Sequence, residues 1–210
     1  MSSLKRLPLL LVVINYHLQV AHGSSSQCVA PETIGYSIRQ EYCDQPIFNV
    51  FLPKTEENQM LDNICATFFP LPDDPNTFTL HVASVYCDES YDVQSYIGAD
   101  VIPGQAIVAN TLNTFRDFAV GYAGCDTNII YRCNEFGVEV PSFVFGVSPQ
   151  CKPIGLSCLR KIQEIIKEQG LPEVDYHILP MKLPNRCVTQ QLCTQPANPF
   201  YNNLHSVAMY

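Results

Sequence analysis

CATFFPLPDDPNTFTLHVASVY, residues 65–86, is the stretch that decides the fold class. An apolar run is followed by a cluster of turn-forming residues at 72–76 and then by a β-branched and aromatic run. Within this second run Phe78, Leu80 and Val82 alternate with other residues, which places their side chains on one face of a strand. The stretch therefore predicts a β-hairpin with one buried face.

Similar β-prone runs, separated by turn residues, continue beyond the hairpin. The further candidate strands are residues 91–97, 105–112, 117–123, 128–133, 138–147 and 176–179. Pro103-Gly104 and residues 134–137 interrupt the pattern. Seven or more short strands of this kind are typical of an antiparallel barrel or sandwich.

One amphipathic helix is predicted at about residues 155–169. Gly170 suits the left-handed position at a helix C-terminus, and Pro172 forbids continuation of the helix. Apolar residues recur at helical spacing, namely Leu159, Ile162, Ile165 and Ile166. Because the remaining positions are mostly charged, we expect the apolar side to dock against the outside of the sheet.

Both ends of the chain are predicted to lie outside the folded domain. A basic pair precedes an apolar run at 7–14, and small residues lead up to Gly23, which is typical of a signal peptide at 1–23. The apolar run is too short to span a bilayer. The tail at 194–210 is rich in Pro and Asn without a period, so we expect it to be irregular or disordered. One domain at 24–193 remains.

Charge and cysteine content favour a secreted protein. Two of the 12 basic residues and none of the 20 acidic residues lie in the signal, so the mature chain has 10 against 20, a net charge of −10. This balance argues against nucleic acid or acidic lipid surfaces as partners. All ten cysteines follow the signal and none forms a tight C-x2-C pair, which favours up to five disulfides over a metal site. Their even number predicts that none is free.

No group of residues points to catalysis. His81 and His177 are the histidines in predicted strands, and neither has a nearby cysteine-and-acid arrangement that would activate a nucleophile. Asp92, Asp100 and Asp117 are too scattered to nominate as catalytic carboxylates. We therefore expect a protein that is not an enzyme, with no catalytic residue, metal site or cofactor.

Several motifs resemble the lipocalin family. The segment NTFRDFAVGYAGC at 113–125 looks like the family's T-D-Y-x-N-Y-A-x-x-Y-x-C strand, and its spacing to the cysteine matches. QCVAP at 27–31, DNIC at 62–65 and NRC at 185–187 resemble other cysteine regions of the apolipoprotein D-like secreted lipocalins. The resemblance implies an all-β fold with one C-terminal helix: an eight-stranded antiparallel up-and-down barrel.

The resemblance also implies two disulfides, one from Cys28 to Cys125 and one from Cys65 to Cys187. The other six cysteines have no counterpart in the family that we can assign.

The floor of the barrel is where the chain departs from the family. Lipocalins close it with a G-x-W tryptophan packed under an arginine, whereas this chain has no tryptophan and has YCDQPIF at 42–48 in that place. The arginine expected after the last long strand is also missing. Our hypothesis is a covalent substitute, a disulfide from Cys43 to Cys151 or Cys158.

A barrel of this size encloses a cavity just wide enough for side chains or one small ligand. We nominate as its lining the apolar and aromatic positions of the candidate strands: Phe78, Leu80, Val82, Tyr96, Val108, Phe118, Val120 and Tyr122. The same alternation also fits residues that pack beneath the helix or fill the barrel.

The implied function is secreted, extracellular binding or transport of a small hydrophobic molecule such as a lipid, retinoid, steroid or pigment. One alternative is a protein-binding or sequestering lipocalin of the defence or inhibitor type, with an extracellular protein partner and a collapsed cavity. Another is a lipocalin-type enzyme acting on a lipid or pigment. A continuous apolar cavity of several hundred cubic ångströms favours the carrier over the sequestering protein.

Overall fold

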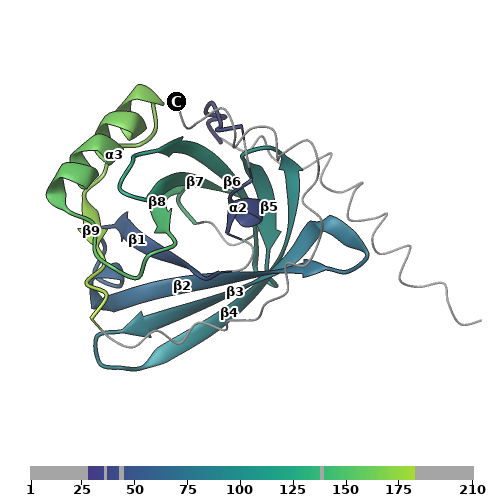
Figure 1. Cartoon of the computed structure of the whole chain (residues 1–210), viewed down its shortest axis with the longest axis horizontal. Coiled ribbons are helices and arrows are strands. Elements are labelled where there is room, and N and C mark those ends of the chain that lie inside the picture. Colours follow the sequence, from purple (N-terminus) through teal and green to yellow (C-terminus); the bar gives the residue numbers. More distant parts are fainter. Residues whose placement is uncertain (1–27, 36, 43–44, 138–139, 183–210) are drawn as a thin grey trace, which may run out of the picture.

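A computed structural model describes residues 28–35, 37–42, 45–137 and 140–182 (Figure 1). The predicted signal peptide and C-terminal tail lie outside these residues. The barrel strands are β1 (Ile47–Pro53), β2 (Leu61–Leu71), β3 (Asp74–Tyr86), β4 (Tyr91–Ile102), β5 (Gln105–Ala109), β6 (Asn113–Tyr122), β7 (Asn128–Gly137) and β8 (Phe143–Ser148).

The eight strands form a closed antiparallel barrel, as predicted. Each strand pairs with the next along the chain, and β1 pairs with both β2 and β8. Phe48 marks the closure, because it lies opposite Cys65 on β2 and Ser148 on β8. A short ninth strand, β9 (Tyr176–Ile178), pairs with the end of β1 beyond β8.

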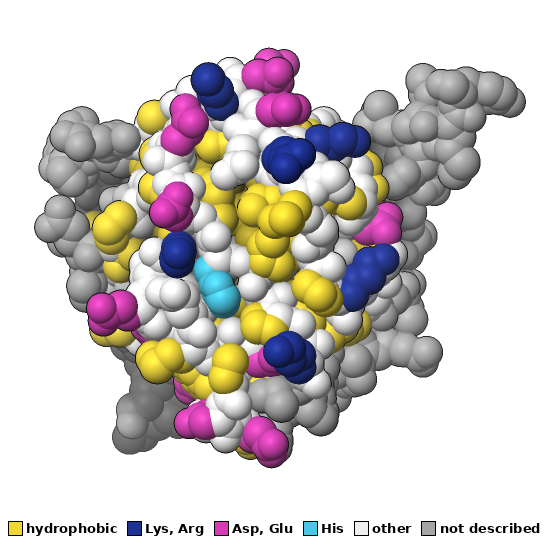
Figure 2. Space-filling model, turned by 90° about the vertical axis from the view of Figure 1, so that its left-hand side faces the viewer, with side chains coloured by type: hydrophobic (Ala, Val, Ile, Leu, Met, Phe, Trp, Pro, Cys, Tyr) yellow, Lys and Arg dark blue, Asp and Glu magenta, His cyan; other side chains and the backbone are white. Residues whose placement is uncertain are grey.

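Among the described residues, three helical segments accompany the barrel: α2 (Ile38–Glu41), the 3-10 turn η1 (Asn58–Met60) and α3 (Leu156–Glu168). The prediction of α3 is confirmed within one residue at each end, and Gly170 has the expected left-handed φ of 64°. Its charged residues are exposed, and the upper part of Figure 2 shows side chains of both signs over this region. The other two segments were not predicted.

Helix α3 creates a second core outside the barrel. Ile162 and Ile166 are fully buried and belong to a cluster with the outer sides of β6 and β7. Gly121 leaves room for the helix, since a Cβ there would lie 2.8 Å from Cγ2 of Ile165. The rings of Phe118 and Tyr131 stack in this outer core with centroids 5.9 Å apart. The outer faces of β6 and β7 beneath α3 are therefore apolar.

The disulfides correct the pairing that the resemblance implied. Cys28 pairs with Cys133, with 5.8 Å between their Cα atoms, and Cys125 pairs with Cys158, with 6.3 Å. The prediction of a Cys28–Cys125 bridge is wrong because Cys125 lies in the turn after β6, where the thiol of Cys158 on α3 is within reach. Cys65 is disulfide-bonded, and its predicted partner Cys187 lies outside the described residues.

The hypothesis of a disulfide at the barrel floor is also wrong. Cys158 is bonded to Cys125 and Cys151 is free, so neither is available to Cys43, which lies outside the described residues. The expectation that no thiol is free fails as well, because Cys87 and Cys151 are both free and exposed.

Candidate ligand-binding site

A cavity of about 690 Å³ occupies the inside of the barrel, and all eight barrel strands contribute to its wall. Along most strands, alternate residues face it, as Phe78, Leu80 and Val82 do on β3. Most of the wall is apolar or aromatic, including Ile64, Ala66, Phe68, Ala106, Val108, Phe115, Ile130, Phe143, Phe145 and Val147. The fold therefore places a largely apolar compartment at the centre of the molecule.

The structure places five of the eight nominated residues on this wall: Phe78, Leu80, Val82, Tyr96 and Val108. The other three, all on β6, do not line it. Phe118 and Val120 belong to the outer core beneath α3, and Tyr122 is 51% exposed. The apolar alternation on β6 selected the wrong face because α3 makes the outer face apolar. Phe115, Asp117 and Ala119 face the cavity instead.

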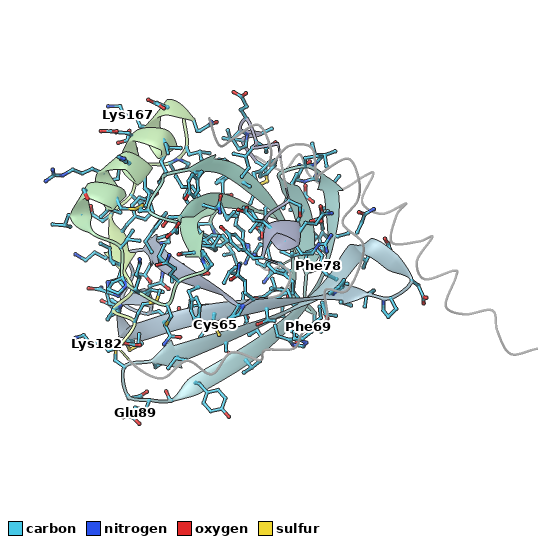
Figure 3. All side chains as sticks on the ribbon, viewed as in Figure 1. Cys65, Phe69, Phe78, Glu89, Lys167 and Lys182 are labelled. Carbon is cyan, nitrogen blue, oxygen red and sulfur yellow. A yellow bond between two sulfur atoms is a disulfide. The ribbon has the colours of Figure 1, made fainter. Side chains whose placement is uncertain are left out.

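Helix α2 and its N-cap Ser37 line one end of the cavity, through Ser37, Ile38 and Arg39. Figure 1 shows α2 within the ring of barrel strands. The Arg39 side chain is 5% exposed, and both Nε and Nη2 donate to Oδ2 of Asp100, at 2.9 and 2.7 Å. Its guanidinium lies 5.4 Å from the ring centroid of Phe78, which Figure 3 shows on the side of the sheet toward α2. The Ser37 hydroxyl also donates to Asp100 Oδ2, at 3.0 Å.

Tyr42 completes this floor. It is buried in the inner core, and its Oη accepts a 2.7 Å hydrogen bond from Nδ2 of the buried Asn128. An arginine packs on an aromatic ring here: Arg39 precedes β1, and its ring partner Phe78 comes from β3. Non-covalent contacts of α2 thus close the floor. Sequence reasoning missed them because four helical residues leave no periodic signal.

A second ion pair lies in the middle of the cavity wall. Asp117 on β6 and Arg132 on β7 are register partners, and the pair is bidentate: Nε donates to Oδ1 and Nη2 to Oδ2, both at 2.7 Å. Burial lowers the pKa of Arg132, but the adjacent Asp117 carboxylate outweighs this and leaves it raised above its ordinary value. Arg132 is therefore a permanent cation whose counter-charge is Asp117.

Aromatic rings surround this cation. Its Cζ atom lies 5.0 Å from the ring centroid of Phe115, 5.3 Å from that of Phe145 and 6.0 Å from that of Tyr96. Such cation–π contacts add to the ion pair in holding the guanidinium in place. The Tyr96 hydroxyl donates to Gln94 Oε1 at 2.7 Å. Both residues line the cavity, so they add uncharged polar groups to its wall.

The opposite end of the cavity is lined by polar residues between β1 and β2 and between β5 and β6. These are Thr55, Glu57, Asn58 and Asn110. Within the described part of the chain, no cluster of three or more His, Cys, Asp or Glu side chains is placed to hold a metal ion. None of the described helices is long and apolar enough to cross a membrane.

Comparisons with known proteins find likeness in structure but not in sequence. No protein-family model and no curated protein sequence matches the chain. The major allergen Per a 4 from cockroaches superposes with a TM-score of 0.51 at 9% identity, over 69% of this chain and 88% of that one.

Two further solved structures score slightly lower. Lobster apocrustacyanin A1 has a TM-score of 0.49 at 8% identity, over 73% of this chain and 91% of that one. The amine-binding protein of Rhodnius prolixus, in its tryptamine complex, has a TM-score of 0.48 at 9% identity, over 70% and 82%. With the closed eight-stranded barrel followed by α3, the likeness to the cockroach allergen shows that this chain has the fold of the lipocalins.

Proposed function

We propose that the protein binds and transports a small hydrophobic molecule in the barrel cavity. The observation that carries this proposal is the cavity itself: about 690 Å³, largely apolar, with its polar groups confined to a few positions. Small-molecule sites in proteins have volumes of roughly 300–1,000 Å³ and this same composition. The sequestering alternative expects a collapsed cavity, so the volume favours the carrier.

We further propose that the protein works outside the cell and is not an enzyme. The disulfides between described residues, Cys28–Cys133 and Cys125–Cys158, support an oxidising compartment, in line with the signal peptide predicted at 1–23. His81 supports a non-catalytic role, because its Nδ1 lies 2.8 Å from the Ser95 hydroxyl and His81 is not part of the cavity wall. The closer likeness to apolipoprotein D-like lipocalins stays a prediction from the sequence motifs.

The test is to look for a bound molecule and then to block the cavity. Native mass spectrometry and organic extraction of the protein from its source should reveal a small apolar ligand. If the recombinant protein is empty, a panel of retinoids, fatty alcohols, steroids and bilins should include a binder.

Val82→Trp supplies the blocking variant, because Val82 lines the cavity. Val93→Trp on the neighbouring strand is the matched control, since Val93 is 45% exposed on the surface. We expect the first variant to lose ligand and the second to keep it. Binding that is equally strong in both variants, or absent from the unmodified protein across the panel, would overturn the proposal.

A further inference from the structure

The cavity contains charged groups, but its buried charges are compensated. Among the described lining residues, the ones that carry charge are Arg39, Arg132, Asp100, Asp117 and Glu57. Each arginine forms an ion pair with one of the two aspartates. Glu57 is exposed and lies at the polar end of the cavity. The described interior therefore offers no uncompensated cation or anion to a ligand.

A charged ligand would consequently lose its hydration without gaining a counter-ion. Transfer of a carboxylate or an ammonium group out of water is costly unless it is paired and hydrogen-bonded. Near the centre of the wall the two charges lie side by side. A carboxylate near Arg132 would therefore be repelled by Asp117, and an ammonium group near Asp117 would be repelled by Arg132. Both aspartates already accept two hydrogen bonds from their own arginine.

An uncharged polar group, by contrast, has a partner in the wall. Nε and Nη2 of Arg132 donate to Asp117, whereas Nη1 donates to none of the described residues. The Arg132 side chain lines the cavity and is 15% exposed, so its third nitrogen leaves this cavity-lining group with an unused donor. The Asp117 carboxylate, 17% exposed, is an acceptor beside it. A hydroxyl group uses both, because it accepts and donates.

From this geometry we propose that the cavity selects uncharged amphipathic ligands, such as long-chain or polyene alcohols, over carboxylates and amines of the same skeleton. Asp117 sets this preference by neutralising Arg132. The inference rests on the proposed function and specifies the ligand class of the same site. It makes Asp117 and Arg132 the specificity-determining residues.

The test compares ligands that share one alkyl chain: dodecan-1-ol, dodecanoic acid and dodecylamine. Each displaces the uncharged fluorescent probe N-phenyl-1-naphthylamine from the full-length protein at pH 8, where the acid is ionised and the amine is charged. We expect the alcohol to bind at least about tenfold more tightly than either charged ligand. If the probe and all three ligands fail to bind, the proposed carrier function fails. If the acid or the amine binds as tightly as the alcohol, only the selectivity is refuted.

Two reciprocal variants test the role of the ion pair. Asp117→Asn keeps the shape and an acceptor oxygen but leaves Arg132 as an unpaired cation, so affinity for dodecanoate should rise at least about tenfold. Arg132→Gln leaves Asp117 as the unpaired charge and should instead favour dodecylamine. Circular dichroism identifies which variants fold, and either one alone suffices for the test.

The matched control is Glu135→Gln. Glu135 pairs with Arg116 across the same two strands, β6 and β7, but neither residue lines the cavity. The Glu135→Gln variant should bind all three ligands with affinities within about threefold of those of the unmodified protein. The proposal fails if dodecanoate affinity is unchanged in Asp117→Asn, or if Glu135→Gln alters it equally.

Discussion

Removal of the Cys125–Cys158 disulfide should destabilise the protein without preventing α3 from docking. The bridge joins residues 33 positions apart. In the chain-entropy model, closing a loop of this length restricts the unfolded chain by an amount worth about 4 kcal/mol at 25 °C. Helix α3 keeps its own contacts, because Ile162 and Ile166 remain fully buried against the barrel. We therefore expect the Cys125→Ala/Cys158→Ala variant to fold and to lose about 4 kcal/mol.

Thermal unfolding followed by circular dichroism measures this loss. For a domain of this size, about 4 kcal/mol corresponds to a fall of roughly 8–16 °C in the unfolding midpoint. The matched control is Cys87→Ala/Cys151→Ala, which removes two exposed free thiols. The free energy of unfolding of this control should change by less than about 0.5 kcal/mol. An unchanged midpoint for the Cys125→Ala/Cys158→Ala variant would refute the reasoning, as would peptide mapping that joins Cys125 to another cysteine.

Three further predictions concern packing, titration and thiol reactivity. A Cβ at Gly146 would overlap the fully buried Phe51 ring, so Gly146→Ala should cost about 1–3 kcal/mol in urea unfolding, and a cost near zero would contradict the packing. Burial, and then the charge of Glu173, raise the pKa of Tyr176 to about 12. This pKa lies above the value of about 10 in an unfolded chain. The contribution of Tyr176 to folding stability is therefore complete below the unfolded pKa and is lost as the pH rises through the folded pKa. Tyr176→Phe should weaken this alkaline loss when unfolding is measured from pH 9 upward, and an identical pH profile would refute the assignment. Among the described cysteines, only Cys87 and Cys151 should be alkylated in the native protein, as peptide mass spectrometry will show. Cys151 should react more slowly than in the unfolded chain, because partial burial of its thiol, and then the charge of Asp62, raise the pKa of that thiol.

Local patterns predicted the elements that have one buried side. The hairpin of β2 and β3 follows from alternation and a turn cluster, and α3 follows from helical spacing and Gly170. Strand β1 was not assigned from its own pattern, because its sequence IFNVFLP is apolar at successive positions. In the structure Val50 and Phe51 are both fully buried in the outer core, at a register shift in the strand, whereas Ile47 and Leu52 belong to the inner core. Such a strand shows no alternation from which to recognise it.

The disulfide pairing depended on the fold rather than on the spacing of cysteines. The resemblance joined Cys28 to Cys125, whereas the structure joins Cys28 to Cys133 on β7. The thiol chosen depends on which side of the barrel each cysteine faces, and on β7 the neighbouring Arg132 faces the cavity while Cys133 faces outward into the core near α3. Knowledge of the register was needed before the partners could be chosen.

The ion pair in the cavity wall also depends on the register of the strands. In a sequence, Asp117 and Arg132 interrupt apolar runs and suggest positions that face solvent. They meet because β6 and β7 pair with these two residues directly opposite each other, and they face inward because side chains alternate along a strand. A slip of one residue would place them under α3 and put Phe118 inside. In a closed barrel the polar positions that interrupt the apolar pattern can face the cavity, and a search for apolar alternation does not find them.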